Sequence, residues 1–119
     1  MKKILLVDDM EITNFITIQF IQHINPQYSV YDFTEPEKAI TQVNDINPDV
    51  IFLDLNMPVM DGWEFLEQMQ QQQMQHKVYI LTSSTSDLDR KRAENFNNVA
   101  GYLVKPLETT LLDDVLASL

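Results

Sequence analysis

Five short apolar runs alternate along the chain with longer stretches in which apolar residues recur at helical spacing. Runs this short suit β-strands, and a continuous apolar run suits a strand that is covered on both faces. The runs span residues 3–7, 28–33, 50–53, 78–81 and 100–104. Strands that alternate with helices over short connections form parallel sheets with right-handed crossovers. The sequence therefore predicts an α/β fold with a five-stranded parallel sheet.

Each stretch that follows a run is expected to form one helix. Thr34 precedes Glu37 by three residues, which is the pattern of a capping box at a helix N-terminus. Asp61 and Gly62 open the third helix, ahead of an apolar helical face. The last two helices are expected over residues 87–96 and 108–118. No linker or second zone of composition interrupts the sequence, so we expect one domain over residues 1–119.

The charge balance is the unusual feature of the composition. Eighteen acidic and eight basic residues give a formal net charge of -10, which disfavours binding to nucleic acids and anionic membranes. The chain has no cysteine, which excludes disulfides and thiolate chemistry. Its apolar start is too short for a signal peptide or a membrane span. We therefore expect a cytoplasmic protein with no membrane contact and no direct contact with nucleic acid.

Acidic, hydroxyl and basic side chains stand directly after four of the predicted strands. They are Asp8 and Asp9, Asp54, Thr82 and Lys105. The carboxyl ends of parallel strands lie along one edge of the sheet, so these side chains should converge there. Each residue alone has a plain structural interpretation as a helix cap, a turn residue or a surface lysine. Their occurrence at matched strand ends favours a shared chemical site.

The expected chemistry of this site centres on Asp54. Three crowded carboxylates raise each other's pKa unless a divalent cation neutralises them, and hard oxygen ligands suit Mg²⁺ or Mn²⁺. The backbone carbonyl of Asn56 is a candidate further ligand. Asp54 would be a nucleophile toward phosphorus, while Lys105 and Thr82 bind other phosphoryl oxygens. Pro106 after Lys105 favours a cis peptide bond that would fix the direction of the lysine.

Two other kinds of protein share parts of this pattern. An aspartyl-phosphate phosphohydrolase needs a second carboxylate two residues after its nucleophile, to act as general acid. Asn56 holds that position after Asp54, and Met10 holds it after Asp8. A flavin-binding module of flavodoxin type needs a phosphate-cradling loop after its first strand, where Asp8 and Asp9 would repel the phosphate. Both alternatives are therefore disfavoured.

The same residues carry a resemblance to a known family. Over its whole length the chain resembles the receiver domain of bacterial two-component response regulators. The matching residues are the pair Asp8-Asp9, the run from Asp54 to Gly62, Thr82, and Lys105-Pro106. The resemblance implies a flavodoxin-like sheet of strand order 2-1-3-4-5 with helices on both faces. The implied Mg²⁺ ligands are Asp8, Asp9, Asp54 and the backbone carbonyl of Asn56.

The resemblance also implies the reaction and a conformational switch. Asp54 would receive a phosphoryl group from a histidine kinase or a phosphotransfer protein, without turnover of an external substrate. Thr82 would then move toward the phosphoryl group, and Tyr102 would turn inward. These movements would change the surface formed by residues 87–96, 100–104 and 108–118, through which a downstream protein is controlled. Without the resemblance, Tyr102 has the ordinary interpretation of a core aromatic.

The oligomeric state and the completeness of the regulator are separate expectations. The resemblance implies a monomer or a weak phosphorylation-dependent dimer. No output domain is evident in the 119 residues. A stand-alone regulator of the chemotaxis-regulator kind and a receiver excised from a longer protein therefore both stay open.

Three of the eight basic residues lie together at Arg90, Lys91 and Arg92. Basic runs on helices are usually solvated faces. The alternative is a partner-binding patch on the fourth predicted helix, where a signalling surface is expected. The sequence leaves both interpretations open.

Overall fold

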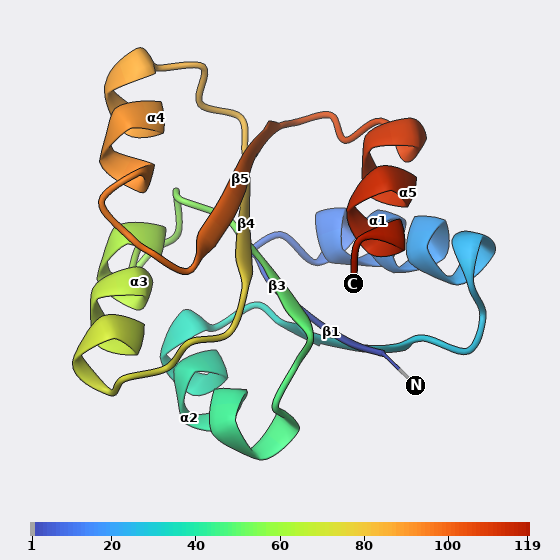
Figure 1. Cartoon of the computed structure of the whole chain (residues 1–119), viewed down its shortest axis with the longest axis horizontal. Helices are drawn as coiled ribbons and strands as arrows, with labels where there is room; N and C mark the ends of the chain where they lie inside the picture. Colours follow the sequence, from blue (N-terminus) through green and yellow to red (C-terminus); the bar gives the residue numbers. More distant parts are fainter. Residues whose placement is uncertain (1) are drawn as a thin grey trace.

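The computed structural model describes residues 2–119, in which a parallel β-sheet is flanked by helices on both faces (Figure 1). The strands are β1 (Lys3–Val7), β2 (Ser29–Phe33), β3 (Val50–Leu53), β4 (Val78–Thr82) and β5 (Val99–Val104). The helices are α1 (Glu11–Ile24), α2 (Pro36–Ile46), α3 (Gly62–Gln71), α4 (Asp87–Ala93) and α5 (Thr109–Ala117). The strand order is β2-β1-β3-β4-β5, and all neighbouring strands are parallel. The predicted fold class and strand order are confirmed.

Side-chain alternation along the strands divides the apolar core into two layers. In β3, Ile51 and Leu53 pack in the layer under α2, α3 and α4, whereas Val50 and Phe52 pack in the layer under α1 and α5. Successive side chains of a strand point to opposite faces, so an uninterrupted apolar run contributes to both layers. Figure 1 shows the same division, with α1 and α5 on one side of the sheet and the other helices opposite.

The register of the strands brings their carboxyl ends level. Val7 of β1 pairs with Leu53 of β3, so the next residues, Asp8 and Asp54, leave the sheet side by side. The backbone N–H of Asp54 also donates to the carbonyl of Val7 at 3.0 Å. Farther along the edge, the last residue of β4 pairs with the last residue of β5, and Lys105 follows directly. The sheet therefore presents these side chains at one edge.

The predicted cap of α2 at Thr34 is wrong. α2 begins at Pro36 with Glu35 as its N-cap, and no side chain among the described residues caps it. Proline at the first helical position has its φ already set for a helix, so the helix begins there regardless of the threonine. α3 begins as predicted after Asp61, whose carboxylate accepts from the backbone N–H of Glu64 at 2.9 Å in a capping box.

The apolar residues at the start of α1 face solvent. Ile12, Phe15 and Ile16 are 58%, 59% and 45% exposed. The buried side of the helix includes the polar residues Asn14 and Thr17. Helical spacing of apolar residues therefore identified this helix without identifying the side that it buries. Within residues 2–119, no helix combines the length and the apolar character needed to cross a membrane.

Candidate functional site

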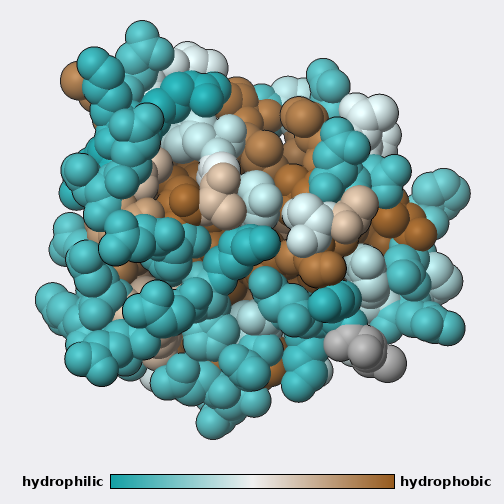
Figure 2. All heavy atoms as spheres, in the orientation of Figure 1, coloured by the Kyte–Doolittle hydropathy of each residue, from teal (hydrophilic) through white to brown (hydrophobic). Residues whose placement is uncertain are grey.

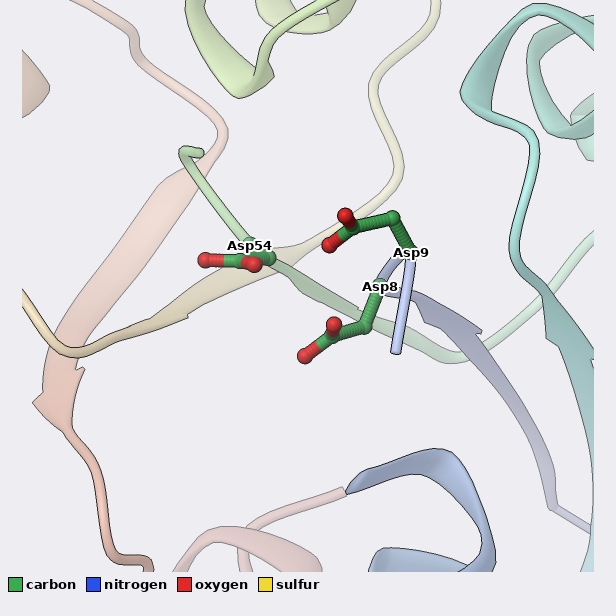
Figure 3. Close-up of side chains that lie close together, drawn as sticks. All are labelled: Asp8, Asp9 and Asp54. Carbon is green, nitrogen blue, oxygen red and sulfur yellow. The ribbon is translucent and has the colours of Figure 1, made fainter. Parts of the chain in front are cut away.

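Three carboxylates meet at the carboxyl edge of the sheet, where β1 and β3 end. Asp8 and Asp9 follow β1 and Asp54 follows β3, and one oxygen from each lies within 4.8 Å of the others. Figure 3 shows the three side chains turned toward a common space from these two strand ends. Asp8 and Asp54 are 5% and 6% exposed, whereas Asp9 is half-buried. The structure thus gathers the three acidic residues into one cluster, which we call the acidic cluster.

Lys105 extends from the end of β5 into the acidic cluster. Its Nζ atom lies 2.6 Å from Oδ2 of Asp8 and 3.6 Å from Oδ2 of Asp54. Its backbone N–H donates to the carbonyl of Thr82 at 2.8 Å, which ties this residue to the end of β4. The peptide bond between Lys105 and Pro106 is cis. The ammonium group therefore contacts two of the three carboxylates.

Burial dominates the electrostatics of Asp54. Loss of water around its carboxyl group raises the pKa of Asp54, the Lys105 ammonium opposes this effect, and the neighbouring Asp8 carboxylate raises the pKa further. The single ammonium group of Lys105 does not balance three carboxylates. The acidic cluster therefore keeps negative charge that a divalent cation would offset. The donors are carboxylate oxygens, which Mg²⁺ and Mn²⁺ prefer. The residues present fit such an ion.

The loop after β3 brings α3 close to the end of the strand. The backbone N–H of Asn56 donates to Oδ1 of Asp54 at 3.4 Å, and the side chain of Asn56 is exposed. The N–H of Gly62 donates to the carbonyl of Leu55 at 2.9 Å. A Cβ atom at Gly62 would overlap the backbone of Asp54 and Leu55. Glycine therefore permits α3 to begin directly beside the candidate nucleophile.

Thr82 and Tyr102 are connected through one residue of the β4–α4 loop. Thr82 is fully buried at the end of β4, and its hydroxyl oxygen accepts from the Ser84 N–H at 3.3 Å. The hydroxyl of Tyr102 donates to the Ser84 carbonyl at 3.1 Å. Tyr102 is half-buried and packs against the core layer under α2, α3 and α4. Ser84 therefore joins the two residues for which the family resemblance implies a switch.

Asn14 is a residue of this site that sequence reasoning missed. Its side chain is 2% exposed and donates to the backbone carbonyl of Asp8 at 3.0 Å. The N–H of Met10 donates to Oδ1 of Asp8, also at 3.0 Å. Both hydrogen bonds hold the turn between β1 and α1 from which the acidic pair projects. The signal in the sequence was a polar residue on the side of α1 opposite its apolar face.

Replacement of Asn14 by alanine is expected to loosen this turn. The Asp8 carbonyl would lose a buried partner, which costs about 1–3 kcal/mol of unfolding free energy. Affinity for Mg²⁺ should fall about tenfold, because residues behind a metal site orient its ligands. Urea denaturation and Mg²⁺ titration measure both effects, with Asn44→Ala on the exposed side of α2 as the control. Equal Mg²⁺ affinity in the two variants would contradict a role for Asn14 at the site.

The fold and the acidic cluster together define a class of protein. A parallel sheet of order 2-1-3-4-5 with carboxylates at its carboxyl edge is a flavodoxin-like α/β fold with a candidate metal centre. Residues 4–117 match the family model of the response regulator receiver domain. The chain therefore belongs to the response regulator receiver domain family of two-component systems.

Individual relatives agree with this assignment. The chain is 32% identical over 89 residues to the alkaline phosphatase synthesis transcriptional regulatory protein PhoP of Bacillus subtilis, covering 75% of this chain and 36% of PhoP. A two-component response regulator from Cytophaga hutchinsonii matches in structure with a TM-score of 0.88 and 29% identity, over 98% of this chain and 95% of that chain. The chemotaxis protein CheY4 of Vibrio cholerae matches with a TM-score of 0.85 and 29% identity, over 99% and 98% of the two chains. The chain spans less than half the length of PhoP and of the curated relatives RpfG and NarL.

Proposed function

We propose that this chain is a phosphoacceptor switch in which Asp54 receives a phosphoryl group in a Mg²⁺-dependent reaction. The donor would be a histidine kinase or a phosphotransfer protein, and residues 1–119 would act as one domain. The observation that carries the proposal is the environment of Asp54. This buried carboxylate lies at a strand end, within 4.8 Å of two further aspartates and 3.6 Å from a lysine ammonium. Membership of the receiver family supports the same conclusion.

Each part of the acidic cluster has a separate task in the proposed transfer. An oxygen of Asp54 attacks phosphorus while the bond from phosphorus to the donor's histidine nitrogen breaks, leaving the bonding electrons on that nitrogen. Asp8, Asp9 and the backbone carbonyl of Asn56 would join Asp54 in holding Mg²⁺ or Mn²⁺. Such an ion, when bound, neutralises negative charge on the phosphoryl oxygens. Lys105 would exchange its contact with Asp54 for a pairing with a phosphoryl oxygen.

The signal is proposed to leave the site through Thr82 and Tyr102. Thr82 would turn its hydroxyl toward the phosphoryl group and so release the Ser84 N–H from which it now accepts. Because Tyr102 donates to the same residue, movement of this loop would change the surface of α4, β5 and α5. Figure 2 shows apolar surface over β5, between α4 and α5, which suits contact with a protein partner. The chain would then act by contact and not by turnover of a substrate.

Incubation with a small phosphodonor tests the proposed function. We expect intact-mass spectrometry to find one added phosphoryl group in the presence of Mg²⁺ and none when the metal is chelated. A chain that stays unlabelled with Mg²⁺ would refute phosphoacceptor function. Equal labelling with and without metal would support phosphoacceptor function but would contradict its dependence on Mg²⁺. Repeated hydrolysis of the donor would instead favour a phosphohydrolase.

The exposed apolar face of α1 is the surface that we assign to the donor. A groove of about 450 Å³ runs from α1 to the loop after β5 and is lined by both Ile16 and Lys105. Lys105 lines this groove and also contacts Asp54, so the groove lies beside the acidic cluster. A helical donor domain that brings its phosphohistidine to this cluster would cover Ile12, Phe15 and Ile16. The net charge of -10 opposes association of a second copy of the chain here.

Phe15 gives a test of this donor surface. We take a kinase that labels the unaltered chain. Phe15→Ser should slow phosphotransfer from this kinase about tenfold, because burying an aromatic side chain contributes about 1–3 kcal/mol to binding of the donor. Labelling by a small phosphodonor should be unchanged. The control is Leu88→Ser, which changes a side chain that is 79% exposed on α4. An unchanged transfer rate from the kinase in Phe15→Ser, or an equal loss in Leu88→Ser, would contradict the assignment.

A further inference from the structure

α4 is held in place by little apolar packing. The helix spans Asp87–Ala93 and ends earlier than its sequence predicts. Of its residues, all of which the structure describes, Ala93 alone is buried. Figure 1 shows α4 at a corner of the molecule, beside β5 and next to α3. So short a helix is not stable by itself, so other contacts must hold it against its neighbours.

Two arginines of the basic run provide such contacts, on opposite flanks of α4. The guanidinium carbon of Arg90 lies 4.7 Å from the ring centroid of Tyr102 on β5. The guanidinium carbon of Arg92 lies 4.5 Å from the ring centroid of Trp63 at the start of α3. Both distances are those of cation–π contacts, for which the planar guanidinium group is well suited. Lys91, between the two arginines, is exposed.

A further contact fastens α4 to the loop that precedes it. The hydroxyl of Ser84 donates to Oδ2 of Asp89 at 2.6 Å. The carbonyl of Ser84 accepts from the hydroxyl of Tyr102. Tyr102, whose ring Arg90 covers, is therefore hydrogen-bonded to Ser84, and Ser84 is in turn hydrogen-bonded to α4 through Asp89. Reorientation of Tyr102 would have to break the Arg90 contact and the Ser84 hydrogen bond together.

We propose that Arg90 and Arg92 are positioning residues that clamp α4 between β5 and α3, and that Arg90 holds Tyr102 in its present orientation. The two arginines then act within the molecule through their ring contacts, although both stay exposed. The clamp itself does not require that Asp54 is phosphorylated. Its consequence for signalling, that Arg90 sets how readily Tyr102 reorients, rests on the proposed function.

An ion pair is the competing explanation for the position of Arg92. Its Nη2 atom lies 3.8 Å from Oε1 of Glu67, and the two side chains are 50% and 52% exposed. Exposed pairs at this distance contribute little to stability. Trp63 is 7% exposed, and the Arg92 guanidinium group lies over its ring. We therefore assign the position of Arg92 to the ring contact.

Hydrogen exchange of the α4 amides in the unphosphorylated protein tests the clamp. Arg90→Met and Arg92→Met should each speed exchange in α4 about two- to fivefold, with the amides of β3 unchanged. Lys91→Met is the matched control, because it removes the same charge from the same helix without touching a ring. Arg90→Lys should speed exchange less than Arg90→Met, since lysine keeps a cation near the ring but lacks the planar guanidinium group. Equal acceleration in all three methionine variants, or in none, would overturn the proposal.

The fluorescence of Trp63, the only tryptophan of the chain, separates the two flanks of the clamp. Arg92→Met should shift its emission, whereas Arg90→Met and Lys91→Met should leave the emission unchanged. Glu67→Gln removes the ion pair alone and should also leave it unchanged. A shift in Glu67→Gln as large as that in Arg92→Met would assign the contact to the ion pair and overturn the clamp at α3. None of these measurements involves phosphorylation, so failure of the clamp and failure of the proposed function are distinct results.

Discussion

Asp54→Asn is expected to stay unlabelled by a small phosphodonor with Mg²⁺, under conditions in which the unaltered chain gains one phosphoryl group. The side-chain amide of asparagine lacks the carboxylate oxygen that attacks phosphorus, and it removes one anionic metal ligand. Asp45→Asn, on the exposed side of α2, is the control and should be labelled like the unaltered chain. Intact-mass spectrometry measures both variants. Full labelling of Asp54→Asn would place the acceptor at another residue.

The same substitution is expected to stabilise the metal-free fold. Burial raises the pKa of Asp54, so the folded state binds its proton more tightly than the unfolded state does. The stability that comes from protonated Asp54 is complete at low pH and is lost as pH rises through the folded pKa. With metal chelated at pH 7, the unfolding free energy of Asp54→Asn should therefore exceed that of the unaltered chain.

Urea denaturation at two pH values measures this effect. The difference between Asp54→Asn and the unaltered chain should be present at pH 7 and should disappear well below about pH 4, where Asp54 is protonated in the folded and the unfolded state. Asp45→Asn should show no such pH dependence, because its side chain is exposed. A variant that is less stable than the unaltered chain at pH 7 would contradict the electrostatic account of Asp54.

Asp9→Ala is expected to weaken Mg²⁺ binding about tenfold or more and to lower labelling in proportion. Asp9 supplies one of the three oxygens that lie within 4.8 Å of one another, and its removal leaves the pair between Lys105 and Asp8 in place. Calorimetric titration with Mg²⁺ measures the affinity. Glu11→Gln is the control, since it removes the same charge from the nearby start of α1.

The two outcomes that would contradict a role for Asp9 differ in meaning. Retained affinity in Asp9→Ala would remove this residue from the metal site. An equal loss of affinity in Glu11→Gln would assign the effect to the general negative field of the protein, and not to ligation.

The strand ends could be predicted because they depend on local patterns. An apolar run that stops at Asp54 indicates both a strand and the point where it ends, and parallel strands bring such ends to one edge. The positions of Asp8 and Lys105 beside Asp54 follow from the same topology. The roles of these residues in phosphotransfer stay predictions, which phosphoryl labelling and Mg²⁺ titration of the variants test.

Contacts between particular pairs of residues could not be predicted in this way. Asn14 was missed because its partner is a backbone carbonyl, which no pattern of side chains encodes. Arg90 and Arg92 are two residues apart, and such neighbours on a helix do not face the same way. Their description as one basic run therefore concealed two separate ring contacts. The apolar face of α1 was also ambiguous, since periodicity does not tell whether such a face meets the core or a partner.

Lys105 and Asp8 are separated by 97 positions in the sequence, yet their side chains are in direct contact. The lysine reaches the acidic cluster only after β5 has joined the edge of the sheet. A chain still emerging during synthesis, or one cut before β5, would carry the carboxylates without the cation that accompanies them. Under the proposed mechanism such a chain could not bind a phosphoryl group as the whole domain does. The complete site would therefore require both ends of the domain, because Asp8 follows the first strand and Lys105 follows the last.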